Sequence, residues 1–301
     1  MSQRLSGNAF AFTSMMAWST AFPATEILLH TWHPLAASVG RLFFGGIALI
    51  ALLIVMGKSR EIIHAPWKQV FYIGGLMLGS ATICLNWGLA LSNPVTAAII
   101  LTSMPAVALV MEVMAHEIRL TPKLVIGITL AAAGGAWASL SGQSGGLGFE
   151  GGEPALLASV VFFVWYSRAA VRHLPTLSAT AKSGLTLSMG GLVVGVVVIP
   201  LHMFGVVTLT YDFSPLPLAL MVWIACISNG ASMALWMTGI ERIGVTIAAI
   251  HMNMVPFYVM LLVLALGDDV SLGQTSGAVL VIAGVIISQW RSKEGRTKDP
   301  E

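Results

Sequence analysis

The stretch VTAAI at residues 95–99, followed by Pro105, returns in the second half of the chain as VTIAAI at residues 245–250, followed by Pro256. Other residues pair around these stretches in the same order: Trp87 with Trp236, Ala133-Gly134 with Ala283-Gly284, and Trp18-Ser19-Thr20 with Trp165-Tyr166-Ser167. This order indicates an internal repeat. We expect one repeat at 1–141, a Gly-rich linker at 142–152, a second repeat at 153–290, and a charged tail at 291–301.

The composition places both repeats in lipid. Apolar residues make up 56% of the 301 residues and charged residues only 9%, against about 25% charged in a soluble domain. Mean hydropathy is +0.86. A helix of about 20 apolar residues crosses the hydrocarbon, and in lipid the backbone must satisfy its own hydrogen bonds. Ten stretches qualify: 8–29, 34–56, 69–91, 94–115, 122–140, 153–174, 178–203, 216–239, 245–266 and 272–290.

The basic residues predict how these stretches are oriented. Thirteen of the 15 Lys and Arg residues fall at the two termini or in alternate connections, and the opposite loops hold none. They are Arg4, Lys58, Arg60, Lys68, Arg119, Lys123, Arg168, Arg172, Arg242, Arg291, Lys293, Arg296 and Lys298. The positive-inside rule then places both termini in the cytoplasm. Because five spans per repeat is an odd number, the repeats enter the membrane from opposite sides. We therefore predict an all-α membrane protein with ten transmembrane helices, arranged as two inverted five-helix repeats around a central cavity.

The paired prolines mark the candidate site. Pro105 and Pro256 lie 9 or 10 residues into their spans, about 14 Å deep. Each proline removes the hydrogen bond to the carbonyl four residues earlier, at Leu101 and Met252. Interruptions at matching places in two halves point to a transport site, although an ordinary kink is the alternative. Ser103, beside Pro105, joins the candidates.

Aromatic residues supply candidate walls. Trp18 and Trp165 sit near the middle of their spans, where an indole N–H needs a polar partner or a ligand. As repeat-related residues, they are expected to face each other across the cavity. Phe22 shares a helix face with Trp18, and Tyr166 neighbours Trp165. Core packing is the alternative for all of them.

Polar and ionisable residues complete the candidate site. Asn229, Met233 and Trp236 form a stripe on one helix, and Asn86 lies within another span; such amides also join membrane helices structurally. Trp236 lies within about a turn of a span end, so an interfacial position is also open for it. His251 and Asn253 are two residues apart, about 200° around a helix, so both cannot point fully into one cavity.

Two basic residues lie inside predicted spans. Arg41 lies about 12 Å deep and either attracts a substrate carboxylate or pairs with a carbonyl or Glu26. Lys182, at a loosely matching place in the second half, is expected to extend to the headgroups.

Several functions find no support. The GxGxxG match at 146–151 follows no strand and is a linker, and the chain has no Walker or HExxH motif. Cys84 and Cys226 lack metal-ligand spacing. We expect no enzyme activity, cofactor, metal site, nucleic acid or obligate protein partner. The expected partners are a small-molecule substrate and the lipid bilayer.

The whole pattern resembles a known family. The arginine in PLAASVGR (34–41) and the run 96–105 followed by Glu117 resemble the EamA branch of the drug/metabolite transporter superfamily. Over 8–290 the chain looks most similar to bacterial aromatic amino acid exporters. This implies a central cavity, peripheral helices five and ten, and outward movement of aromatic and other neutral amino acids across the inner membrane by alternating access.

Two features depart from the resemblance and leave alternatives open. The second half carries Asp268-Asp269 where the first has His116-Glu117. Glu26 is too near the outer end of its span to serve as the mid-helix glutamate of proton-coupled multidrug relatives, so the driving force stays open. The alternatives are export of other metabolites or drugs, such as lipophilic cations or nucleotide sugars, and a membrane-embedded enzyme.

Overall fold

The structure is a computed structural model, and it describes residues 3–92, 94–142, 151–255, 257–258 and 272–289. These residues form helices and connections, with no strand among them. Five helical stretches are long and apolar enough to cross a membrane. They are Pro34–Val55, Trp67–Leu89, Glu153–His173, Ala179–Met203 and Pro215–Ile243, and shorter apolar helices cover Ile99–Met114, Pro122–Trp137, Val245–Met254 and Val279–Ser288. The helical class is confirmed, whereas the count of ten spans stays a prediction.

The first half consists of helices separated by short connections. They are α1 (Gln3–Ser19), α2 (Ala21–Leu28), α3 (Pro34–Val55), α4 (Ser59–Ile63), α5 (Trp67–Val70), η1 (Phe71–Leu78), α6 (Gly79–Ala90), α7 (Pro94–Leu101), α8 (Met104–Met114) and α9 (Pro122–Gly142). Local chemistry explains several ends. Pro34 opens α3, where a missing N–H costs nothing, and the His33 ring accepts from the N–H of Leu35 at 3.2 Å. Gly57, with φ +71°, follows the end of α3.

The second half follows the same plan. Its elements are α10 (Glu153–His173), α11 (Ala179–Met203), α12 (Pro215–Trp223), η2 (Ile224–Ala231), α13 (Ser232–Ile243), α14 (Val245–Ile250), η3 (His251–Met254) and α16 (Leu272–Gln289). Both η1 and η2 are π-helical turns inside long helices, and they occupy corresponding places in the two halves. No sequence pattern predicted them.

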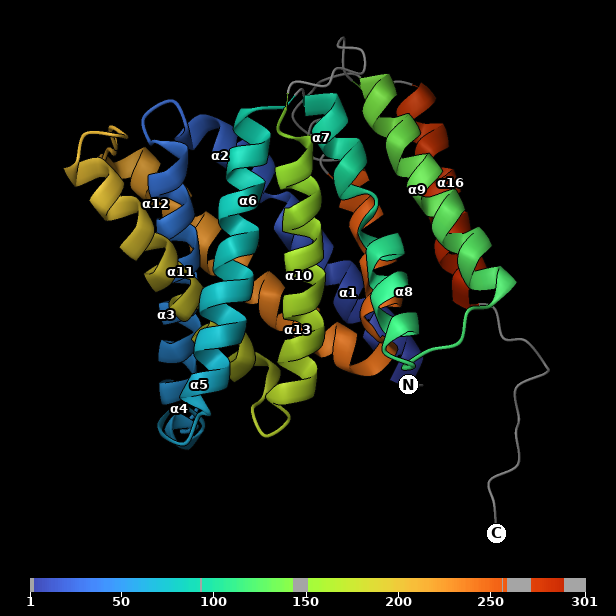
Figure 1. Cartoon of the computed structure of the whole chain (residues 1–301), viewed down its shortest axis with the longest axis horizontal. Helices are drawn as coiled ribbons and strands as arrows, with labels where there is room; N and C mark the ends of the chain where they lie inside the picture. The colour runs from blue at the N-terminus through green and yellow to red at the C-terminus, as the bar shows by residue number, and fades with distance from the viewer. Residues whose placement is uncertain (1–2, 93, 143–150, 256, 259–271, 290–301) are drawn as a thin grey trace.

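The two halves pack against each other element by element. Helix α3 packs on α11, α8 on α14 and α9 on α16, while α1 packs on α13 and α10 on α6. This pairing is unchanged when the halves are exchanged, as the predicted repeat requires. Figure 1 shows α9 and α16 side by side at one edge of the bundle.

Close backbone contacts let the helices pack tightly. A Cβ on Gly45 would lie 2.5 Å from the carbonyl oxygen of Ala225, and a Cβ on Gly284 would lie 2.5 Å from that of Gly127. Only glycine permits such approaches, which are typical of helix packing in membranes.

The predicted interruption at Pro105 is a full break. Helix α7 ends at Leu101 and α8 begins at Met104. Between them, the N–H groups of Thr102 and Ser103 bond to carbonyls three residues earlier, at 3.1 and 3.0 Å. In the second half, α14 tightens into the 3-10 turn η3 just before Pro256, which itself lies outside the described residues.

Candidate functional site

A cavity lies between the two halves, with an empty volume of about 870 Å³ that includes space open to solvent. It is lined by Ser14, Met15, Trp18, Arg41, Leu42, Leu78, Ala81, Thr82, Leu85, Asn86, Leu101, Met104, Ser159, Val160, Phe163, Asn229, Ser232, Met233, Trp236 and Met252. Both halves therefore contribute walls, and most of the wall is apolar.

Five of the predicted site residues meet in this cavity. Trp18 of α1, Arg41 of α3, Asn86 of α6, Asn229 of η2 and Met233 of α13 all line it.

The interrupted helices reach the same cavity. Leu101 and Met252, whose carbonyls lose a donor to the two prolines, both line it. The helix breaks therefore lie at the cavity wall.

Trp165 is a correction to the sequence prediction. It does not line the cavity, and its side chain is 47% exposed on the outside of the bundle. Phe163 lines the cavity instead. Two residues along a helix turn the side chain by about 200°, so a helix that presents Phe163 inward must present Trp165 outward. Repeat symmetry did not predict this outward direction of Trp165.

Tyr166 is also placed differently from the prediction. Its side chain is fully buried outside the cavity lining, and its hydroxyl lies 3.0 Å from the Thr186 hydroxyl. It joins α10 to α11, which is the packing role that the sequence left open. Ser103 lies at the start of α8, with its hydroxyl buried and unpartnered, outside the lining of the cavity.

His251 and Asn253 both lie behind the cavity wall. The His251 ring is 2.8 Å from the side-chain oxygen of Asn8, so it joins η3 to α1. Asn253 is buried with both polar side-chain atoms unpartnered. Neither residue lines the cavity. The side chain of Phe22 lies outside the described part of the chain.

Trp236 lines the cavity, a position that the sequence left open. It shares a stripe with Asn229 and Met233, but its nearness to a helix end left an interfacial position open. The structure buries its ring in the cavity wall, 6.3 Å from the ring of Phe163, and its N–H donates to the Ser167 hydroxyl at 3.3 Å.

Arg41 dominates the electrostatics of the cavity. Among the described lining residues it is the only charged one. Its guanidinium makes no ion pair or hydrogen bond with any residue that the structure describes. The side-chain amide of Asn229 donates to the Arg41 carbonyl at 3.0 Å, which holds this part of α3 against η2. A charge at this depth is expensive unless a partner of opposite charge accompanies it.

A second polar pair lies in the wall of the cavity. Asn86 donates from its amide to the hydroxyl of Ser38, which in turn bonds to the carbonyl of Pro34 at 2.8 Å. This chain ties α6 to α3 beside Arg41. Within the described residues, no group of three His, Cys, Asp or Glu side chains could hold a metal ion.

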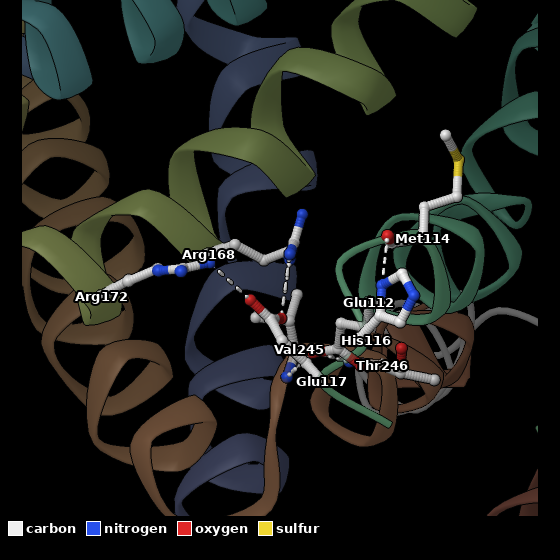
Figure 2. A network of polar contacts seen from close by, with 8 residues as sticks. All are labelled: Glu112, Met114, His116, Glu117, Arg168, Arg172, Val245 and Thr246. Atoms are coloured by element: carbon white, nitrogen blue, oxygen red, sulfur yellow. Dashed lines mark hydrogen bonds and ion pairs between the residues drawn. The ribbon is translucent and has the colours of Figure 1, made fainter. Parts of the chain in front are cut away.

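A polar network lies at the end of the bundle that is predicted to face the cytoplasm (Figure 2). Glu117 pairs with Arg168 at 2.9 Å and with Arg172 at 3.2 Å. The buried carboxylate of Glu112 accepts the backbone N–H of Val245 at 3.0 Å and that of Thr246 at 3.4 Å. First-half acids therefore contact α10 and α14 of the second half.

Comparison with known proteins agrees with this architecture. Residues 5–140 match the EamA-like transporter family. The chain is also 25% identical over 246 residues to the uncharacterized transporter YyaM of Bacillus subtilis (strain 168), covering 80% of this chain and 79% of YyaM. These two findings support a membrane transporter of the EamA type.

A solved crystal structure shares the fold. It superposes with a TM-score of 0.80 over 94% of this chain and 96% of the other, at 21% identity. At that identity the likeness concerns the fold alone, and it extends beyond the half of the chain that the family match covers.

Proposed function

We propose that this protein is a secondary transporter that exports aromatic and other neutral amino acids across the bacterial inner membrane by alternating access, with both termini in the cytoplasm. The observation that carries the proposal is Arg41. An arginine without a described protein partner, set in a mostly apolar cavity within the predicted spans, is suited to an anionic group that the substrate brings.

The rest of the wall fits the remainder of an amino acid. The rings of Trp18, Phe163 and Trp236 offer apolar and aromatic surface to a side chain. The carbonyl of Leu101, which loses a donor to Pro105, and that of Met252, which accepts the N–H of Val255 but has a second lone pair, are neutral acceptors for an ammonium group. One cation together with neutral acceptors suits a zwitterion.

The interrupted helices also suit a site whose access changes from one side of the membrane to the other. Broken helices near the midplane, one from each repeat, let the repeats rock against each other around a bound substrate. The exchange-symmetric packing of the halves gives two related arrangements of the same contacts. This symmetry supports alternating access with the substrate held between the repeats.

The rival substrates fit less well. A lipophilic cation requires a carboxylate in the cavity, whereas the described lining offers a positive charge. A nucleotide sugar carries several negative charges and requires several basic groups.

Transport in proteoliposomes tests the proposal. The purified protein is reconstituted into vesicles, and the transport of labelled phenylalanine, a lipophilic cation or a nucleotide sugar is measured with and without a proton gradient. We expect phenylalanine transport, lowered about tenfold or more in Arg41→Gln because a charge-assisted hydrogen bond is worth about 1.5–3 kcal/mol. Trp18→Ala should also lower it.

Trp165→Ala is the matched control, because that tryptophan faces outward and should leave transport unchanged. Transport of the cation with unaltered rates in Arg41→Gln would refute the substrate class.

A further inference from the structure

The helices pack closely beyond the cavity, toward the end that is predicted to face the cytoplasm. On four of the helices that line it, the residue about one turn beyond the cavity is fully buried. These residues, which we call the floor, are Ala11 of α1, Ala108 of α8, Ser167 of α10 and Met237 of α13. A substrate arriving from that side cannot pass until the floor separates.

Below the floor, an ion-pair cluster joins the two repeats. Glu117 follows α8 in the first half, and Arg168 and Arg172 lie one turn apart near the end of α10 in the second half (Figure 2). Arg168 contacts Glu117 through Nη2 at 2.9 Å and Nε at 3.3 Å, and Arg172 contacts it through Nη1 at 3.2 Å. We call these three residues the clasp.

The ion pairs of the clasp are only partly shielded from water. The Arg168 side chain is 16% exposed and that of Glu117 36% exposed. Water therefore reaches the carboxylate, and the Arg172 side chain, 66% exposed, is already largely solvated. Two arginines on one carboxylate still make a stronger contact than an isolated surface pair.

The end of the bundle that is predicted to face outward has no Lys or Arg in its loops that could form a second clasp. At the corresponding place the second repeat carries Asp268-Asp269, which lie outside the described residues. The loops predicted to lie outside the cell contain no Lys or Arg at all. The charge bias that orients the protein thus supplies arginines to one gate only.

We propose that Glu117, Arg168 and Arg172 form the cytoplasmic gate of the transport cycle. The inference rests on the proposed transport function and on the predicted topology. With the clasp closed, α8 and α10 hold the floor together; when it opens, the floor separates and the cavity admits substrate from the cytoplasm. Because no matching clasp is available outside, the clasp biases the protein toward the state that is closed to the cytoplasm.

Thiol accessibility of the floor tests this gate. In a Cys84→Ser, Cys226→Ser background, Ala108→Cys places one reporter in the floor, and a charged, membrane-impermeant thiosulfonate is added to inside-out vesicles. We expect Glu117→Gln and Arg168→Gln to raise the labelling rate about three- to tenfold, the effect of losing a partly exposed pair network. Raising the salt concentration should increase labelling of the parent but not of Glu117→Gln.

Arg119→Gln is the matched control. It removes an exposed charge two residues from Glu117, and Arg119 has no described ion pair. Its labelling should equal that of the parent. Equal labelling in all variants, together with no salt dependence in the parent, would overturn the gate.

Failure of the gate and failure of the substrate proposal are separable. The labelling needs no substrate, so a rate that rises in Glu117→Gln supports the gate even if phenylalanine is not carried. Normal phenylalanine export with unchanged labelling refutes the gate alone. If Glu117→Gln does not accumulate in membranes, the salt dependence of the parent decides.

Discussion

Replacing Glu112 by alanine should destabilise the junction between the two halves. Its carboxylate, 5% exposed, accepts the N–H groups of Val245 at 3.0 Å and Thr246 at 3.4 Å. These are the first two N–H groups of α14, which have no acceptor within their own helix.

The cost can be worked out contact by contact. The shorter hydrogen bond to a charged acceptor is worth about 1.5–3 kcal/mol, and the longer one less. A negative charge at a helix N-terminus adds about 0.3–1 kcal/mol. Glu112→Ala should therefore cost about 2–4 kcal/mol. Glu112→Gln keeps one acceptor oxygen and should cost about half as much.

Thermal unfolding of the detergent-purified protein measures the relative stability of these variants. The signal is the exposure of Cys84 and Cys226 to a thiol-reactive fluorophore. Both cysteines lie in helices and are partly buried in the folded state. Glu117→Gln is the reference, because its half-exposed pairs are worth about 0–1 kcal/mol. The midpoint should fall most in Glu112→Ala, less in Glu112→Gln and least in Glu117→Gln. A Glu112→Ala midpoint equal to that of Glu117→Gln would refute the capping role.

Two further predictions concern packing and a loop. Gly74→Ala should lower the amount of inserted protein, because the new Cβ would lie 2.5 Å from the carbonyl oxygen of Thr186, whereas Gly79→Ala, with no atom nearer than 3.7 Å, should accumulate normally on immunoblots; equal amounts would contradict the helix spacing. The backbone N–H and the hydroxyl of Ser214 hold the pKa of Asp212 below its usual value. That contribution to stability is present above the unfolded aspartate pKa of about 3.9 and is lost as pH falls through the lower folded value. The difference in unfolding midpoint between the parent and Asp212→Asn should thus be present at pH 7 and vanish in strong acid, and a difference that persists there would contradict the assignment.

The sequence predicted the helical class because the hydropathy of each stretch can be read from its own residues, without knowledge of the tertiary structure. The span at 34–56 appears as α3 and the span at 153–174 as α10. The span at 8–29 was wrong in one respect, because the structure interrupts it between Ser19 and Ala21. Pro23, which has no N–H for the carbonyl four residues earlier, was a signal for that break.

The π-helical turns could not be predicted in the same way. The sequences FYIGGLML at 71–78 and IACISNGA at 224–231 share no pattern. A widened turn depends on what packs against the helix, and here each one packs against a long helix of the other half, η1 on α11 and η2 on α3. The repeat is therefore more regular in backbone geometry than in sequence.

Within the site, the sequence did not predict the direction in which each side chain points. Trp18 lines the cavity, but Trp165, its counterpart in the predicted repeat, faces outward. Contacts that join distant segments were also beyond the sequence, as in the bond between His251 and Asn8. Such a contact depends on how helices rotate about their own axes, and in a helix that is apolar on every side the sequence pattern does not specify that rotation.

The two basic residues inside the predicted spans differ in their partners. Lys182 was expected to extend to the headgroups, but the structure buries it, 4% exposed, with its ammonium 2.5 Å from the carboxylate of Glu241. Its charge is therefore neutralised within the second half. Arg41, at the loosely matching place in the first half, has no such carboxylate among the described residues and lines the cavity. Because a buried charge needs a counter-charge, the first half is left with a requirement that a bound substrate can meet. The two halves therefore use their basic residues differently: Lys182 joins α11 to α13 through Glu241, whereas Arg41, which has no partner among the described residues, lines the cavity.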